Sequence, residues 1–126
     1  MNFFSKYGYA LDPESMNRNL GIIAANLEAS ASEQVYKDCF SMMDLTTLKT
    51  DDTPASVTKL VNKVNTFNET YPEWPLPASL CVYPNFAAVV KEARKCDVNI
   101  TVVSACFPSS QSFLEVKLRE CEIAVE

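Results

Sequence analysis

Three short apolar stretches that alternate with amphipathic ones constrain the fold of this chain most strongly. The apolar stretches lie near residues 42–48, 79–83 and 100–106, and each has the length of a buried strand. Between the first two, apolar residues from Val57 to Val64 recur with the i, i+3, i+4, i+7 spacing of one helix face. Because strands joined by helical crossovers form right-handed βαβ units, the sequence predicts three parallel strands in the order 1-2-3, with helices on one face.

The residues before the first strand predict helices. Asp12 followed by Pro13 is typical of a helix N-cap with proline at the first helical position. Apolar residues then recur at helical spacing from Met16 to Leu27. A second short helix is expected over residues 32–40, directly before the first strand.

The predicted elements make one partial domain over residues 1–126, with 1–40 as an N-terminal helical extension and 41–126 as three βα units. The last predicted helix runs to Glu126 with no glycine or proline to end it. Three parallel strands also leave a sheet edge unpaired. We therefore expect the sequence to be a fragment of a larger fold.

Charge and hydropathy exclude several classes of function. The net charge is -5 and the 11 basic residues are scattered, whereas nucleic-acid-binding proteins gather such residues on one face, so no nucleic-acid partner is expected. The longest apolar runs fall far short of the ~20 residues that span a bilayer. The first six residues lack the pattern of a secretion signal. A cytoplasmic protein with no membrane association is expected.

The reactive side chains exclude several types of catalysis. The sequence has no histidine, so neither Ser-His-Asp nor Cys-His chemistry is available. Its five cysteines form no C-x-x-C pair, and we interpret them as reduced, mostly buried thiols. No metal site and no cofactor are expected. Any acid-base chemistry must use carboxylates, lysines, tyrosines or cysteines.

Two residues inside the predicted strands are candidates for a site. Asp44 lies between the apolar residues Met43 and Leu45, where a buried carboxylate is costly unless it is paired. It is either part of a polar site or a buried residue held by threonine hydroxyls and backbone N–H groups. Cys81, in the second strand, is on its chemistry alone a small core residue.

Four motifs, taken together in their order and spacing, resemble the deoxyribose-phosphate aldolases. They are D-L-T-x-L at 44–48, D-x-T at 51–53, C-V-Y-P-x-F at 81–86 and V-x-x-x-F-P at 103–108. The resemblance covers the chain from about Met42 to Val125. The chain departs from the family pattern at Asn85, where an arginine is frequent, and at Ser109 and Ser110, where a glycine is usual.

The resemblance implies a fold and a reaction. The fold is the N-terminal half of a (β/α)8 TIM barrel, with about three βα units preceded by N-terminal helices. The reaction is that of a class I aldolase in deoxyribonucleotide catabolism. A lysine forms a Schiff base, and 2-deoxy-D-ribose 5-phosphate is reversibly cleaved to glyceraldehyde 3-phosphate and acetaldehyde. The implied substrate is a small phosphorylated sugar.

The resemblance also implies roles for four residues. Asp44 and Thr46 belong to a supporting polar network around the catalytic lysines, and Cys81 and Ser104 belong to the wall of the substrate pocket. Asp44, Cys81 and Ser104 are expected at comparable heights on successive strands. The Schiff-base lysine and the acid-base aspartate are expected beyond Glu126, so the chain alone is expected to be inactive. It is also expected to self-associate or to pair with the missing C-terminal half.

The lysines in the sequence support that expectation. Lys49 is the only one of the eight that directly follows a predicted strand, and the acidic residues Asp51 and Asp52 nearby would raise a lysine pKa, the wrong direction for a Schiff base. All eight are expected on solvated surfaces. On the open side of the sheet, the apolar residues Leu45, Val82 and Val102 are expected to face solvent.

Two other functions fit parts of the sequence. An acidic α/β chain of this length is typical of a receiver-like signalling domain, but that domain needs five strands with an aspartate ending the third. The third predicted strand here ends in Cys106, Phe107 and Pro108. The other alternative is a non-catalytic α/β assembly piece that folds with a partner completing its sheet.

Overall fold

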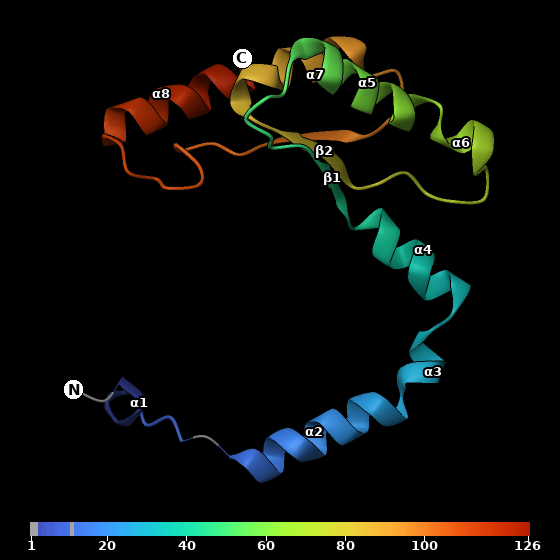
Figure 1. Cartoon of the computed structure of the whole chain (residues 1–126), viewed down its shortest axis with the longest axis vertical. Helices are drawn as coiled ribbons and strands as arrows, with labels where there is room; N and C mark the ends of the chain where they lie inside the picture. The colour runs from blue at the N-terminus through green and yellow to red at the C-terminus, as the bar shows by residue number, and fades with distance from the viewer. Residues whose placement is uncertain (1–2, 11) are drawn as a thin grey trace. The chain divides into compact units, whose positions relative to one another are not determined.

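The computed structural model describes residues 3–10 and 12–126, which form two compact units (Figure 1). The first unit extends to Tyr36 and the second begins at Lys37. None of the helices in these described ranges is long and apolar enough to cross a membrane.

The first unit is helical, as the sequence predicts. It contains α1 (Phe3–Lys6), α2 (Pro13–Ala25), α3 (Leu27–Ser30) and the start of α4 (Glu33–Ser41). The carboxylate of Asp12 accepts hydrogen bonds from the N–H groups of Glu14 and Ser15, both at 3.1 Å, which confirms the predicted N-cap.

The second unit is built on a sheet of three parallel strands in the order β1-β2-β3. The strands are β1 (Asp44–Thr46), β2 (Ser79–Val82) and β3 (Asn99–Val102). Their number, order and direction are those predicted from the alternation in the sequence. Among the described residues these three strands form the whole sheet, two fewer than the five of a receiver domain.

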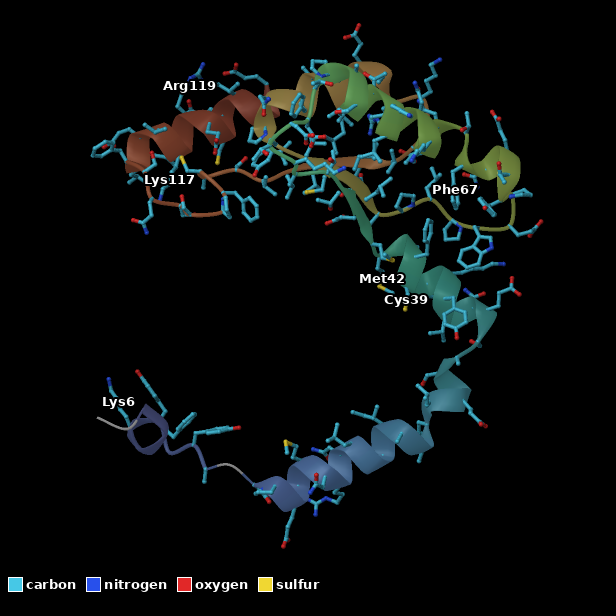
Figure 2. The ribbon with its side chains drawn as sticks, viewed as in Figure 1. Lys6, Cys39, Met42, Phe67, Lys117 and Arg119 are labelled. Carbon is cyan, nitrogen blue, oxygen red and sulfur yellow. The ribbon has the colours of Figure 1, made fainter. Side chains whose placement is uncertain are left out.

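The strands are shorter than predicted, for a reason that the backbone shows at each end. Before β1, the N–H of Met42 donates to the carbonyl of Cys39, so the last turn of α4 occupies residues expected to be extended (Figure 2). After β3, Ala105 and Cys106 have φ angles of 60° and 58°, which no strand residue adopts. The chain turns away from the sheet there.

Five helical segments follow the strands of the second unit. They are α5 (Pro54–Asn65), α6 (Phe67–Thr70), the short 3-10 helix η1 (Pro84–Phe86), α7 (Ala87–Ala93) and α8 (Leu114–Val125). The helix α5 begins where the sequence predicts. Thr53 caps it, because its hydroxyl accepts from the N–H of Ser56 while the Ser56 hydroxyl accepts from the Thr53 N–H.

The hydrophobic core lies between the sheet and the helices α5 and α7 (Figure 1). Leu80 and Val82 of β2 are fully buried against residues of these helices such as Val57 and Val90. Leu45 of β1 packs against the same cluster. The expectation that Leu45, Val82 and Val102 face solvent is therefore wrong. Side chains alternate along a strand, and these residues belong to the face that the helices cover.

Candidate functional site

The face of the sheet opposite the helices is polar, although the strands are short and mostly apolar. Strand pairing places the side chains of this face in two rows, because paired residues of parallel strands point to the same side. We name the two rows together the polar sheet face. Its residues are Asp44, Ser79 and Asn99 in the first row and Thr46, Cys81 and Thr101 in the second.

The carboxylate of Asp44 is held by the neighbouring strand. Its Oδ1 atom accepts a hydrogen bond of 2.6 Å from the hydroxyl of Ser79, a side chain that is 3% exposed. Asp44 itself is exposed, so its second oxygen is available to a ligand. Thr46 donates its hydroxyl proton to the backbone carbonyl of Asp44, at 3.3 Å. Sequence reasoning missed Ser79, and only the strand register identifies it as the partner of Asp44.

The other predicted site residues lie at different heights. Cys81 is buried in the central strand, paired with Thr46 in the second row. Ser104 follows β3 by two residues and is half-buried in the loop beyond the carboxyl end of the sheet. The expectation of comparable heights is wrong, since β1 begins only at Asp44 and β3 ends before Ser104. The register brings Thr46 and Cys81 together and leaves Ser104 above them.

The loop between β1 and α5 is organised by Asp52. Its Oδ2 atom accepts from the Thr47 hydroxyl at 2.8 Å and from the Lys49 N–H at 3.0 Å, and its Oδ1 atom accepts from the Ser56 hydroxyl at 3.3 Å. The Thr47 hydrogen bond is the main cause of a lowered pKa for Asp52, and the Lys49 and Ser56 hydrogen bonds add to it against the effect of desolvation. The carboxylate therefore fixes the loop at the carboxyl end of β1.

The lowered pKa of Asp52 predicts how stability depends on pH. Because the folded-state pKa lies below the ordinary value of 3.8, Asp52 contributes stability above that pH, and the contribution is lost as the pH falls through the folded-state pKa. Urea denaturation between pH 6 and pH 3 is the measurement. Asp52→Asn should be less stable than the natural chain near pH 6, with the difference shrinking below about pH 4. Asp51→Asn is the control, and equal behaviour of the two variants would contradict the assignment.

The loop after β3 contains three residues other than glycine with positive φ. They are Ala105, Cys106 and Ser110, the last with a φ of 52°. Ser110 is one of the two serines, with Ser109, that depart from the family pattern, and a glycine would adopt its conformation without steric cost. Of these two serines, only Ser110 lies where the backbone favours glycine.

Introducing a glycine at Ser110 should stabilise the chain. In the left-handed region a residue with a Cβ lowers the free energy of unfolding by roughly 1–2 kcal/mol relative to glycine. Part of this advantage of glycine is lost because glycine also gives the unfolded chain more conformational entropy. Ser110→Gly should therefore raise the free energy of unfolding by about 0.5–1 kcal/mol, measured by urea denaturation. Ser109→Gly, one residue away and outside the left-handed region, should leave it unchanged or lower it. Equal effects of the two substitutions would contradict this reading of the loop.

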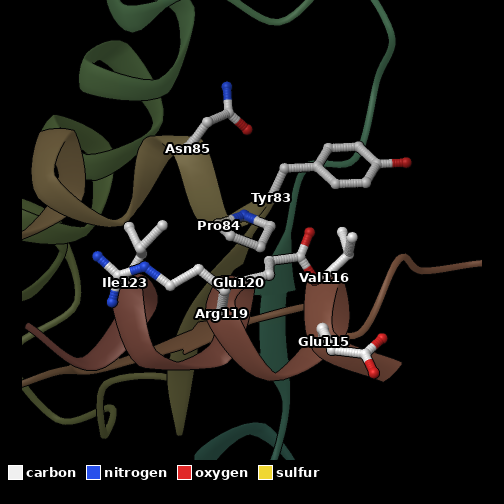
Figure 3. A pocket seen from close by; sticks show the side chains of 8 residues that line it. All are labelled: Tyr83, Pro84, Asn85, Glu115, Val116, Arg119, Glu120 and Ile123. Carbon is white, nitrogen blue, oxygen red and sulfur yellow. The ribbon is translucent and has the colours of Figure 1, made fainter. Parts of the chain in front are cut away.

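A groove of about 640 Å³ lies between η1 and α8, beside the carboxyl end of β2 (Figure 3). Asn85, the other position that departs from the family pattern, is part of its wall. The residues that line it are Tyr83, Pro84 and Asn85 from the end of β2 and η1, and Glu115, Val116, Arg119, Glu120 and Ile123 from α8.

The polar sheet face carries no lysine. All eight lysines lie outside β1, β2 and β3, in helices or in the loops that follow them. Lys49, in the loop after β1, is exposed and its backbone N–H binds Asp52. Within residues 3–10 and 12–126 no cluster of three or more histidine, cysteine or acidic side chains could hold a metal ion. The chemistry of the face is that of a carboxylate, hydroxyls, an amide and one buried thiol.

The curated proteins found to be similar to this chain share one name. A Caenorhabditis elegans protein assigned provisionally as a deoxyribose-phosphate aldolase is 40% identical over 86 residues, which is 66% of this chain and 28% of that protein. The deoxyribose-phosphate aldolases of Homo sapiens and Bos taurus are each 31% identical, over 68% and 67% of this chain and 30% of their own lengths. This chain thus spans less than a third of the curated relatives it matches. No family model matches it.

A solved structure shows the same fold. The tetrameric deoxyribose-phosphate aldolase of Aeropyrum pernix superposes on 71% of this chain and 35% of its own length, with a TM-score of 0.53 and 22% identity. The parallel three-stranded sheet with its helices is therefore similar to part of that TIM-barrel fold. The resemblance seen in the motifs is confirmed, and over about two thirds of its length this chain is homologous to the deoxyribose-phosphate aldolases.

Proposed function

We propose that this chain supplies the first three βα units of a (β/α)8 barrel that acts as a deoxyribose-phosphate aldolase. The observation that carries the proposal is the polar sheet face. Three parallel strands bury apolar side chains under helices on one side and present Asp44, Thr46 and Ser79 on the other. In a barrel of this type the second side is the interior, and the active site lies at its carboxyl-terminal end.

Each predicted site residue has a role in this proposal. The exposed oxygen of Asp44, with Thr46 beside it, accepts hydrogen bonds from groups around the reacting amine of a lysine. The hydrogen bond from Ser79 fixes the carboxylate in one orientation. Cys81 and Ser104 form part of the wall around 2-deoxy-D-ribose 5-phosphate. Ser104 is the nearer of the two to the carboxyl end of the sheet, because it follows β3.

The Schiff-base lysine is, in the same proposal, supplied by residues other than 1–126. A lysine that attacks a carbonyl needs a depressed pKa, which burial and a neighbouring cation provide. The eight lysines here lie off the strands, and Lys49 is exposed beside an acidic loop. This chain then contributes the wall and the supporting network of the site, and needs no cofactor.

The proposal extends to partners and location. The solved relative is described as tetrameric, and this supports self-association or pairing with the remaining barrel units. Sedimentation equilibrium of the chain alone should then give a mass above 14.0 kDa. The five cysteines are all free, which favours a reducing compartment such as the cytoplasm. Cell fractionation that recovered the protein from an oxidising compartment would contradict that location.

A chimeric enzyme tests the function. Residues 37–126, the second compact unit, would replace the matched segment of the Homo sapiens deoxyribose-phosphate aldolase. The proposal predicts retro-aldol cleavage of 2-deoxy-D-ribose 5-phosphate by the chimera, followed through the release of acetaldehyde. Circular dichroism shows whether the chimera folds. A folded chimera without cleavage activity would reject the proposal.

A further inference from the structure

The carboxylate of Glu120 links α8 to the loop that follows β3. Its Oε2 atom accepts a hydrogen bond of 2.9 Å from the backbone N–H of Cys106, fourteen residues earlier in the chain. Glu120 is half-buried, unlike most of the α8 side chains around it, which are exposed. A hydrogen bond from an N–H to a carboxylate is stronger than one between neutral groups. The contact therefore joins two segments that the sequence separates.

The loop that Glu120 contacts has an unusual backbone. Ala105 and Cys106 are consecutive residues in the left-handed region, where side chains with a Cβ are disfavoured. Such a conformation persists only when surrounding interactions hold it. The Cys106 N–H binds Glu120, and its carbonyl accepts from the Ser110 N–H at 2.9 Å. The backbone N–H and the backbone carbonyl of Cys106 are therefore both held by hydrogen bonds.

Glu120 also lies close to the segment that follows β2. Its side chain lines the groove together with Tyr83, Pro84 and Asn85, which directly follow β2 (Figure 3). The neighbouring Arg119 donates to Glu122 at 3.1 Å. The Glu120 carboxylate thus lies where the segments after β2 and β3 meet α8, at the end of the sheet where barrel enzymes bind their substrates.

We propose that Glu120 is a positioning residue for the site. Its carboxylate holds Ala105 and Cys106 in the left-handed conformation and so fixes the place of the preceding Ser104. The significance for catalysis rests on the function proposed above, in which Ser104 forms part of the pocket wall. We name the hydrogen bond from the Cys106 N–H to the Glu120 carboxylate the clamp. It is a property of this chain and can be measured without any aldolase activity.

Amide hydrogen exchange and amide proton shifts in the 15N-labelled full chain test the clamp. Glu120→Ala should speed exchange at the Cys106 amide by about tenfold, the effect of losing one such hydrogen bond. It should also move the Cys106 amide proton upfield. Glu120→Gln keeps an oxygen acceptor and should restore much of the protection. Glu122→Ala, an exposed carboxylate on the same helix, is the matched control and should leave Cys106 unchanged.

Each result decides the proposal. Unchanged Cys106 exchange in Glu120→Ala, or an equal change in Glu122→Ala, would overturn it. If Glu120→Ala does not fold, Glu120→Gln decides alone: the Cys106 amide proton should move upfield because its acceptor has lost its charge, and an unmoved signal would overturn the clamp. If Glu120 only stabilised α8 in general, Glu120→Gln would not restore amide protection at Cys106 alone. An inactive chimera would reject the proposed function and leave these measurements unaffected.

Discussion

Replacing Leu80 with alanine should lower the free energy of unfolding of this chain by about 3 kcal/mol. Leu80 is the second residue of the central strand and its side chain is fully buried. It packs in the cluster that joins the sheet to the helices through Val57, Val61 and Val90. Truncation removes buried apolar surface and leaves a cavity that helices on one side and a sheet on the other cannot readily close. The loss is a large part of the stability of a small domain.

The control for this effect is the same substitution on the surface. Leu118 lies on α8 and is 55% exposed, so Leu118→Ala should change the free energy of unfolding by less than about 1 kcal/mol. Urea denaturation followed by circular dichroism measures both variants. Similar losses for Leu80→Ala and Leu118→Ala would contradict the assignment of the helix-covered face as the core.

The second large effect is expected at Asp44. In the chimeric enzyme described above, Asp44→Ala should lower kcat for cleavage of 2-deoxy-D-ribose 5-phosphate by about two orders of magnitude. The substitution removes a carboxylate that the Ser79 hydroxyl fixes from 2.6 Å, on the face assigned to the barrel interior. Such a preorganised group acts on charge that develops in the transition state, so the loss should appear in kcat more than in KM.

Two further variants separate catalysis from loop structure and from orientation. Asp51→Ala removes an exposed carboxylate from the loop after β1 and should leave the rate within a few-fold of the chimera. Ser79→Ala keeps the Asp44 carboxylate and removes its hydroxyl partner, so an intermediate loss is expected. The proposed role of Asp44 is wrong if Asp44→Ala and Asp51→Ala give the same rate.

The sequence predicts the fold well because the apolar pattern is local. Alternation of strands and helices gave the number, direction and order of the strands, and Pro54 and Asp12 marked helix starts that the structure confirms. The ends of the strands depend on neighbours instead. A turn that follows α4 extends to Met43, whose N–H donates to the carbonyl of Phe40. The left-handed residues Ala105 and Cys106 end the extended segment after β3. Neither of these strand ends can be predicted from the hydropathy pattern of the sequence.

The candidate site depends on register, which the sequence does not specify. The motifs identify Asp44 and Cys81, but a shift of one residue between strands would place Asp44 opposite a different partner. The pairing of Asp44 with Ser79 therefore comes from the structure alone. The same holds for Glu120, which lies fourteen residues from the backbone group it binds. The local spacing of residues in the sequence does not predict polar contacts between segments this far apart.

In the proposed function this chain builds a wall of an aldolase site whose Schiff-base lysine lies outside residues 1–126, and borohydride trapping locates that lysine. The folded chimera would be incubated with acetaldehyde, reduced with borohydride and digested for peptide mass spectrometry, which locates the reduced Schiff base. The proposed function predicts one adduct, on a lysine of the Homo sapiens segment, and none on the eight lysines of this chain. An adduct on any of those eight, or a folded chimera that forms no adduct, would contradict it.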